Sequence, residues 1–155
     1  MWRPYFKSTT SWKATTLAVI SLLLISLSYL SSCQSNISIE TAQYAVNGQK
    51  LYTTHCANCH GGKGEGLGKL YPPLTDNEYL TANRAKLPVI VKHGLEGEIE
   101  VLGEIYDQPM PANPTLADME IAYILTYVTT TFGASDSTYT LEEVQNALKK
   151  FSSPY

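Results

Sequence analysis

Residues 56–60 read Cys56-Ala57-Asn58-Cys59-His60, and this stretch limits the fold and chemistry of the 155-residue chain more than any other. Three kinds of site explain only part of this motif. A zinc site needs a second Cys/His pair, and no such pair accompanies the motif. A thioredoxin-like redox pair follows a strand and has no need of the histidine. A disulfide between the two cysteines is compatible with an exported protein, but it also leaves His60 unexplained.

The remaining interpretation uses all three side chains. C-x-x-C-H is the attachment sequence of c-type haem. Each thiol adds across one vinyl group of the porphyrin, and two intervening residues match the separation of the vinyls. The residue that follows is then placed beneath the iron, where its imidazole is the proximal ligand. The motif predicts one covalently bound haem c attached to Cys56 and Cys59, with His60 as an axial ligand of the iron.

A second axial ligand has few candidates in the rest of the chain. Met119 lies in a stretch with helical periodicity, where a packing role is preferred. His55 directly precedes the haem motif and belongs to the same face of the haem, and His93 has the setting of a surface histidine at a helix end. Met110 lies between two prolines in residues 107–111, and a thioether on rigid backbone suits an electron-transferring iron. Met110 is therefore the predicted second ligand.

The first thirty residues have the layout of an export signal. Residues 14–30, ATTLAVISLLLISLSYL, carry no charge. A positively charged segment followed by an apolar one is typical of a secretory signal, although 17 residues also reach the lower limit for a retained membrane helix. The basic residues that precede this segment are Arg3, Lys7 and Lys13.

A lipid attachment site follows the apolar segment directly. Leu30-Ser31-Ser32-Cys33 resembles a bacterial lipobox, in which the cysteine is acylated and becomes the new N-terminus. Several acyl chains on Cys33 would give stable anchoring. We therefore expect an extracytoplasmic protein anchored by lipid to a bacterial membrane, either the outer membrane or the periplasmic face of the inner membrane. Gln34 stands where an aspartate would favour retention in the inner membrane, which points to the outer one.

Composition excludes several classes of protein. With 44% hydrophobic and 16% charged residues, the chain is too apolar for disorder and too mixed for a polytopic membrane protein. The net charge of −3 argues against a nucleic-acid partner. Removing the basic leader leaves 8 basic against 14 acidic residues, a net charge of −6, which favours partners with a basic face.

Several further segments accompany the haem motif in a fixed order along the chain. In sequence they are residues 48–52, the haem motif, Gly61-Gly62, Pro72-Pro73-Leu74, residues 101–106 with Met110-Pro111, and residues 116–128. In these segments and their order, the chain resembles the class I cytochromes c of the small bacterial monohaem kind over about residues 40–133. One departure is the hairpin turn, which has Leu102-Gly103 where Asn-Gly would be commoner.

The resemblance implies an all-α protein with the class I cytochrome c fold. The N- and C-terminal helices cross over the covalently bound haem, and a short β-hairpin precedes the methionine loop. Gly48 fits the contact between the two helices, because a side chain there would hold them apart. Pro72 is implied to offer its backbone carbonyl to the second ring nitrogen of His60, with the neighbouring Pro73 as the alternative.

Patterns in the sequence agree with this architecture. Ala45, Gly48 and Tyr52 form one face of a helix over residues 41–54. Alternating residues from Glu98 predict a hairpin that turns at Gly103. Two further helices are expected, each opened by a capping box. One begins with Thr115 and Asp118 and ends near Gly133, and the other covers residues 140–151 and begins with Thr140 and Glu143.

The predicted organisation has four parts. Residues 1–32 are a signal peptide that is removed, residues 33–40 a lipidated tether, residues 41–133 the cytochrome c domain, and residues 134–155 a C-terminal extension with a short amphipathic helix. The predicted function is electron transfer by Fe(II)/Fe(III) cycling with His/Met ligation, without enzymatic activity or a small-molecule substrate. Redox proteins would dock transiently at the haem edge. The alternatives are a cytochrome subunit of a larger redox enzyme, or a gas- or peroxide-binding sensor if Met110 does not bind the iron.

Overall fold

The computed structural model describes residues 16–22 and 37–151, which belong to separate units. Residues 16–22, inside the expected signal peptide, form a short exposed helix. Cys33 and the residues around it lie outside the described residues. No helix within the two described stretches is long and apolar enough to cross a membrane.

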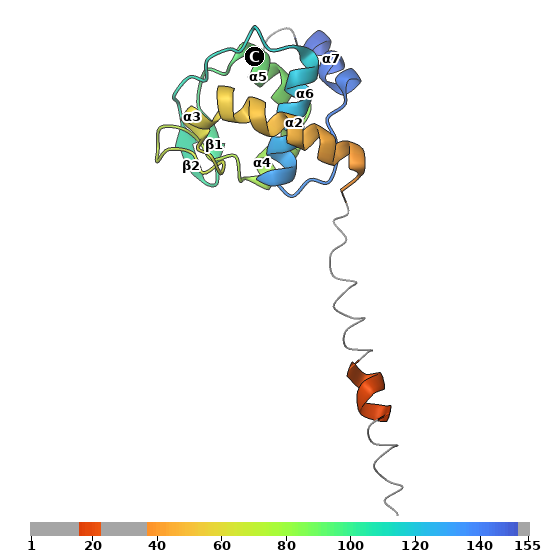
Figure 1. The fold of residues 1–155 in the computed structure, drawn as a ribbon. Helices are drawn as coiled ribbons and strands as arrows, with labels where there is room; N and C mark the ends of the chain where they lie inside the picture. Colours follow the sequence, from red (N-terminus) through yellow and green to blue (C-terminus); the bar gives the residue numbers. More distant parts are fainter. Residues whose placement is uncertain (1–15, 23–36, 152–155) are drawn as a thin grey trace, which may run out of the picture. The chain divides into compact units, whose positions relative to one another are not determined.

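Two helices form the centre of the unit that begins at Ile37. Helix α2 (Ile39–His55) crosses helix α6 (Asp118–Thr131), as Figure 1 shows. Gly48 is buried at the crossing, and an added Cβ would lie 2.8 Å from the Cβ of Tyr127 and closer still to the carbonyl of Tyr123. Aromatic rings flank the contact, with Tyr44 and Tyr123 at 4.8 Å between ring centroids. The predicted glycine contact is therefore present.

Helix α6 does not begin as predicted. Its N-cap is Ala117, and the Glu120 carboxylate accepts a hydrogen bond from the Ala117 N–H at 2.9 Å. The predicted capping box of Thr115 with Asp118 is wrong, because residues 113–116 form a turn that buries Leu116. Thr115 is exposed within this turn, before the helix begins. The helix itself runs to Thr131, close to the expected end near Gly133.

Three short helices and one hairpin connect α2 to α6. The helices are α3 (Ala57–His60), α4 (Asn77–Ala82) and α5 (Leu87–His93). Strands β1 (Ile99–Val101) and β2 (Glu104–Tyr106) pair antiparallel, with Ile99 opposite Tyr106. Leu102 (φ 52°) and Gly103 (φ 77°) both have positive φ, the geometry of a type I′ turn. Leu102 thus occupies a conformation that asparagine or glycine adopts at lower cost.

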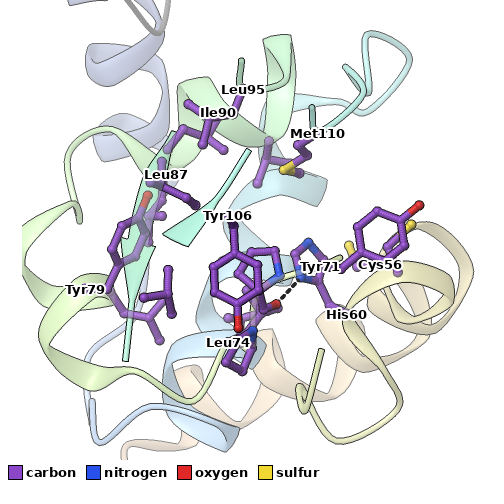
Figure 2. A pocket seen from close by; sticks show the side chains of 18 of the residues that line it. Cys56, His60, Tyr71, Leu74, Tyr79, Leu87, Ile90, Leu95, Tyr106 and Met110 are labelled. Carbon is purple, nitrogen blue, oxygen red and sulfur yellow. Dashed lines mark hydrogen bonds between the residues drawn. The ribbon is translucent and has the colours of Figure 1, made fainter. Parts of the chain in front are cut away.

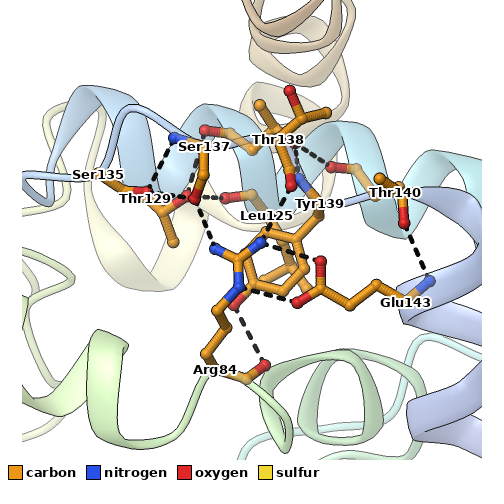
Figure 3. A network of polar contacts seen from close by, with 11 residues as sticks. Arg84, Leu125, Thr129, Ser135, Ser137, Thr138, Tyr139, Thr140 and Glu143 are labelled. Carbon is orange, nitrogen blue, oxygen red and sulfur yellow. Dashed lines mark hydrogen bonds and ion pairs between the residues drawn. The ribbon is translucent and has the colours of Figure 1, made fainter.

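The C-terminal extension packs on the cytochrome unit. Helix α7 (Leu141–Lys150) has Thr140 as its N-cap, and the Thr140 hydroxyl accepts a hydrogen bond from the Glu143 N–H at 3.1 Å. The Glu143 carboxylate does not complete the expected capping box, because it pairs with two Arg84 nitrogens at 2.8 and 2.9 Å (Figure 3). The Arg84 guanidinium also lies over the buried Tyr139 ring, 3.9 Å from its centroid. Val144 and Ala147 complete the buried contact.

Candidate functional site

A large apolar cavity lies between the haem motif, the hairpin and the segment around Met110 (Figure 2). It encloses about 1080 Å³ of atom-free space, part of it open to solvent. Its apolar lining suits a planar apolar cofactor such as a porphyrin. Most of the residues that line it are aliphatic or aromatic. The inner wall includes Leu80, Leu87, Ile90, Val91, Ile124, Leu125 and Val128.

One wall carries the haem motif. Helix α2 ends at His55, Cys56 caps it, and α3 is a single turn that carries Cys59 and His60 to the cavity. The Tyr52 hydroxyl donates to the Gly61 carbonyl at 2.6 Å and ties the end of α3 back to α2. No disulfide joins the two cysteines, and burial raises the pKa of the Cys56 thiol to about 11. The motif thus presents two cysteine sulfurs and an imidazole to one cavity.

His60 is oriented by the proline segment. Its Nδ1 lies 2.9 Å from the Pro72 carbonyl oxygen, which can only accept, so Nδ1 carries the proton. Burial lowers the pKa of His60, and the bond to Pro72 partly offsets that effect. A neutral imidazole with its proton on Nδ1 leaves Nε2 free to bind a metal. Of the two prolines considered, Pro72 is the one whose carbonyl accepts the hydrogen bond from His60.

The approach of the proline segment to His60 depends on Gly66, a residue that the sequence patterns do not single out. Gly66 has a φ of +70°. A Cβ at this position would lie 2.8 Å from the Pro73 nitrogen and 2.9 Å from the Pro72 carbonyl carbon. The loop after α3 therefore packs backbone against backbone on the segment that contacts His60. No signal in the sequence separates Gly66 from ordinary turn glycines.

Met110 lies on another wall of the same cavity, and Figure 2 shows its side chain directed into the space that the His60 imidazole also borders. Within residues 16–22 and 37–151, His60 and Met110 are the only histidine and methionine that line the cavity. His55 and His93 are exposed, and Met119 packs against the core. The three rival ligands considered from the sequence are thus outside the cavity.

The hairpin and α4 are joined at the cavity wall by Asp76. One carboxylate oxygen accepts from the Tyr79 N–H at 3.0 Å and caps α4, and the other accepts from the Leu102 N–H at 2.9 Å in the hairpin turn. These backbone hydrogen bonds, that of Tyr79 first, lower the pKa of Asp76. Asp76 thus holds the strained turn against α4 while it is ionised.

We expect Asp76→Asn to remove part of the acid sensitivity of folding. Because the pKa of the folded state is lowered, the contribution of Asp76 is complete above the unfolded pKa of about 3.9 and is lost as pH falls through the folded value. The free energies of unfolding of wild type and variant should therefore differ most above about pH 4 and converge below it. Denaturant unfolding between neutral and acid pH measures this difference. Asp107→Asn, an exposed position after β2, is the control and should show no such convergence.

Comparisons with known proteins match the part of the chain that forms this site. The family model described as cytochrome c matches residues 45–132. Two cytochromes c-552, one from Thermus thermophilus and one from a particular strain of the same species, are each 33% identical to the chain over 118 residues. The alignments cover 70% of this chain and 89% and 79% of the two relatives. The residues matched by the family model include the haem motif, the hairpin, Met110 and helix α6.

Proposed function

The chain belongs to the cytochrome c family and carries a covalent haem c, and on this premise we propose that it is a lipid-anchored one-electron carrier with His60 and Met110 as axial ligands. Electron transfer with haem c is common to the family. The ligand pair, the attachment residues, the anchor and the absence of enzymatic activity are the parts that the proposal adds.

The attachment of the haem is assigned to Cys56 and Cys59. Both thiols border the cavity, neither is used in a disulfide, and the single turn of α3 that joins them also brings His60 to the same wall. The cavity is lined mainly by apolar side chains, as a porphyrin requires, and its polar groups are few. The donor set of two thiols and one imidazole has the chemistry that haem c requires.

The observation that carries the proposed ligation is the pairing of His60 with Met110 at one cavity. The hydrogen bond to Pro72 fixes the imidazole with Nε2 unprotonated. Met110 is half-buried and offers a neutral thioether, a ligand that favours the ferrous state over the ferric one. With the haem bound, histidine and methionine would together fill the iron's two open positions and leave none for a substrate. This arrangement suits an electron carrier better than a gas or peroxide sensor.

When bound, the haem supplies one-electron chemistry between Fe(II) and Fe(III). The chain's residues limit what else can happen. Apolar side chains from α5 and α6 exclude water from the inner wall, and the rigid contacts of His60 limit rearrangement between the two oxidation states. Exposed glutamates of the hairpin segment lie beside Gly97 and Ile99, which border the cavity. Together with the net charge of −6, they favour a transient redox partner with a basic face.

The anchor is inferred from the sequence. Cys33 follows a charged leader and an apolar segment at the lipobox position, and the described unit begins at Ile37, four residues later. A lipid on Cys33 would hold the cytochrome close to an extracytoplasmic membrane surface. Such an anchor increases the effective concentration of the carrier for partners on that membrane.

Expression of the full chain in a bacterium that matures c-type cytochromes tests the proposal. We expect a haem-stained band that survives denaturation, an oxidised spectrum with a sulfur-to-iron charge-transfer band, and acyl label in the membrane fraction. Cys33→Ser should lose the acyl label but keep haem and spectrum. A high-spin oxidised spectrum would contradict the ligation. Unchanged labelling of the serine variant would contradict the anchor.

A further inference from the structure

The segment that carries Met110 has little structure of its own. Residues 107–117 contain neither a helix nor a strand, apart from a single bridge at Met110. Three of these residues are prolines, which have no N–H to donate. The segment, here called the methionine loop, has one backbone hydrogen bond of its own, from the Leu116 N–H to the Asn113 carbonyl at 3.2 Å, and is held in place mainly by contacts with other elements.

Backbone contacts fix Met110 to the residues just after α5. Leu95 and Met110 exchange two hydrogen bonds, with N···O distances of 3.0 and 2.8 Å. Gly94 lies beneath the loop at a φ of +82°, and an added Cβ would lie 2.9 Å from the Ala112 nitrogen and even closer to the Met110 carbonyl. These contacts bring the loop against the end of α5, but they involve only the first half of the loop.

Two side chains hold the second half of the methionine loop to α5. The Lys92 ammonium donates to the carbonyl oxygens of Pro114, at 3.1 Å, and Leu116, at 2.6 Å. The Asn113 amide donates in the reverse direction, from the loop to the Val91 carbonyl at 3.2 Å. Hydrogen bonds from an ammonium are stronger than those between neutral groups. Lys92 also lies in the last turn of α5, where a positive charge is favoured by the helix dipole.

We propose that Lys92 and Asn113 are positioning residues that keep the methionine loop closed and thereby keep Met110 at the iron. The inference rests on the proposed His/Met ligation. Neither side chain borders the cavity, so both act through the loop. If the loop opened, Met110 would no longer be held at the iron, and an added ligand such as imidazole could bind there instead. The apparent affinity for imidazole therefore measures the population of the open loop.

Imidazole titration of the oxidised holoprotein tests this role. Lys92→Met keeps the length and apolar stem of the side chain but removes the ammonium. We expect it to bind imidazole about tenfold more tightly than wild type, which corresponds to a shift of about 1.4 kcal/mol toward the open loop. On heating, the charge-transfer band of Lys92→Met should also disappear at a lower temperature than that at which its helical structure is lost. Lys92→Arg, which retains a charged donor, should restore much of the wild-type affinity.

Lys86→Met is the matched control, because Lys86 is exposed at the other end of α5 and its loss removes the same charge. It should leave imidazole affinity unchanged. Equal affinities for Lys92→Met and wild type would overturn the proposal, as would equal gains in both methionine variants. Asn113→Ala provides a second measurement if Lys92→Met does not retain haem, and an unchanged affinity there also overturns it. A wild-type protein without the charge-transfer band would instead contradict the His/Met ligation itself.

Discussion

Gly48→Ala is expected to destabilise the protein by about 3 kcal/mol, although alanine normally stabilises a helix interior relative to glycine by about 1 kcal/mol. The added Cβ would collide with the backbone of Tyr123 and the Cβ of Tyr127 on α6. Neither atom lies at the end of a flexible side chain, so the two helices would have to separate. Separation would also weaken the aromatic contact between Tyr52 and Tyr127, whose ring centroids are 5.3 Å apart.

Denaturant unfolding of the holoprotein measures this effect. Asn47→Ala, at the exposed neighbouring position, is the matched control and should stabilise the protein by about 0.5 kcal/mol through helix propensity alone. A gain in stability for Gly48→Ala would show that α2 and α6 do not approach each other at this glycine. A loss of similar size in both variants would show that the effect belongs to α2 rather than to the crossing.

The features that the sequence predicted well depend on residues close together in the chain. Helix α2 follows from the spacing of Ala45, Gly48 and Tyr52, and the start of α7 follows from Thr140 and the N–H of Glu143. The hairpin follows from the alternation before Leu102 and the glycine that ends the turn. The class I cytochrome c fold was inferred from the order of such local motifs, and the family match confirms it.

The features that the sequence did not predict are contacts between residues far apart. Arg84 and Glu143 are separated by 59 residues, and nothing near Arg84 in the sequence indicates that it pairs with α7. The same pairing explains why Glu143 does not complete a capping box. Lys92 has the sequence setting of a surface lysine until α5 and the methionine loop are brought together. The capping box predicted at Thr115 was wrong for a related reason. The burial of Leu116 determines the backbone conformation around Thr115.

Met110→Ala is expected to produce the largest functional change. Removing the thioether should abolish the sulfur-to-iron charge-transfer band and leave the iron open to carbon monoxide in the reduced state. The reduction potential should fall, because the proposed ligand, which favours the ferrous state, is lost, and axial ligands set haem potentials over about 0.8 V. Potentiometric titration and the carbon monoxide spectrum of the full holoprotein measure both effects.

Met119→Ala provides the matched comparison, since Met119 packs against the core from α6 and does not border the cavity. It should destabilise the protein by about 2 kcal/mol, as truncation of a partly buried methionine does, while potential and spectrum stay at their wild-type values. The two variants thus separate loss of packing from loss of ligation. A wild-type potential in Met110→Ala would show that Met110 is not a ligand of the iron. Because Met119, His55 and His93 lie outside the cavity, the iron would then be ligated by His60 alone, by another lining residue such as a tyrosine, or by a group outside the described residues.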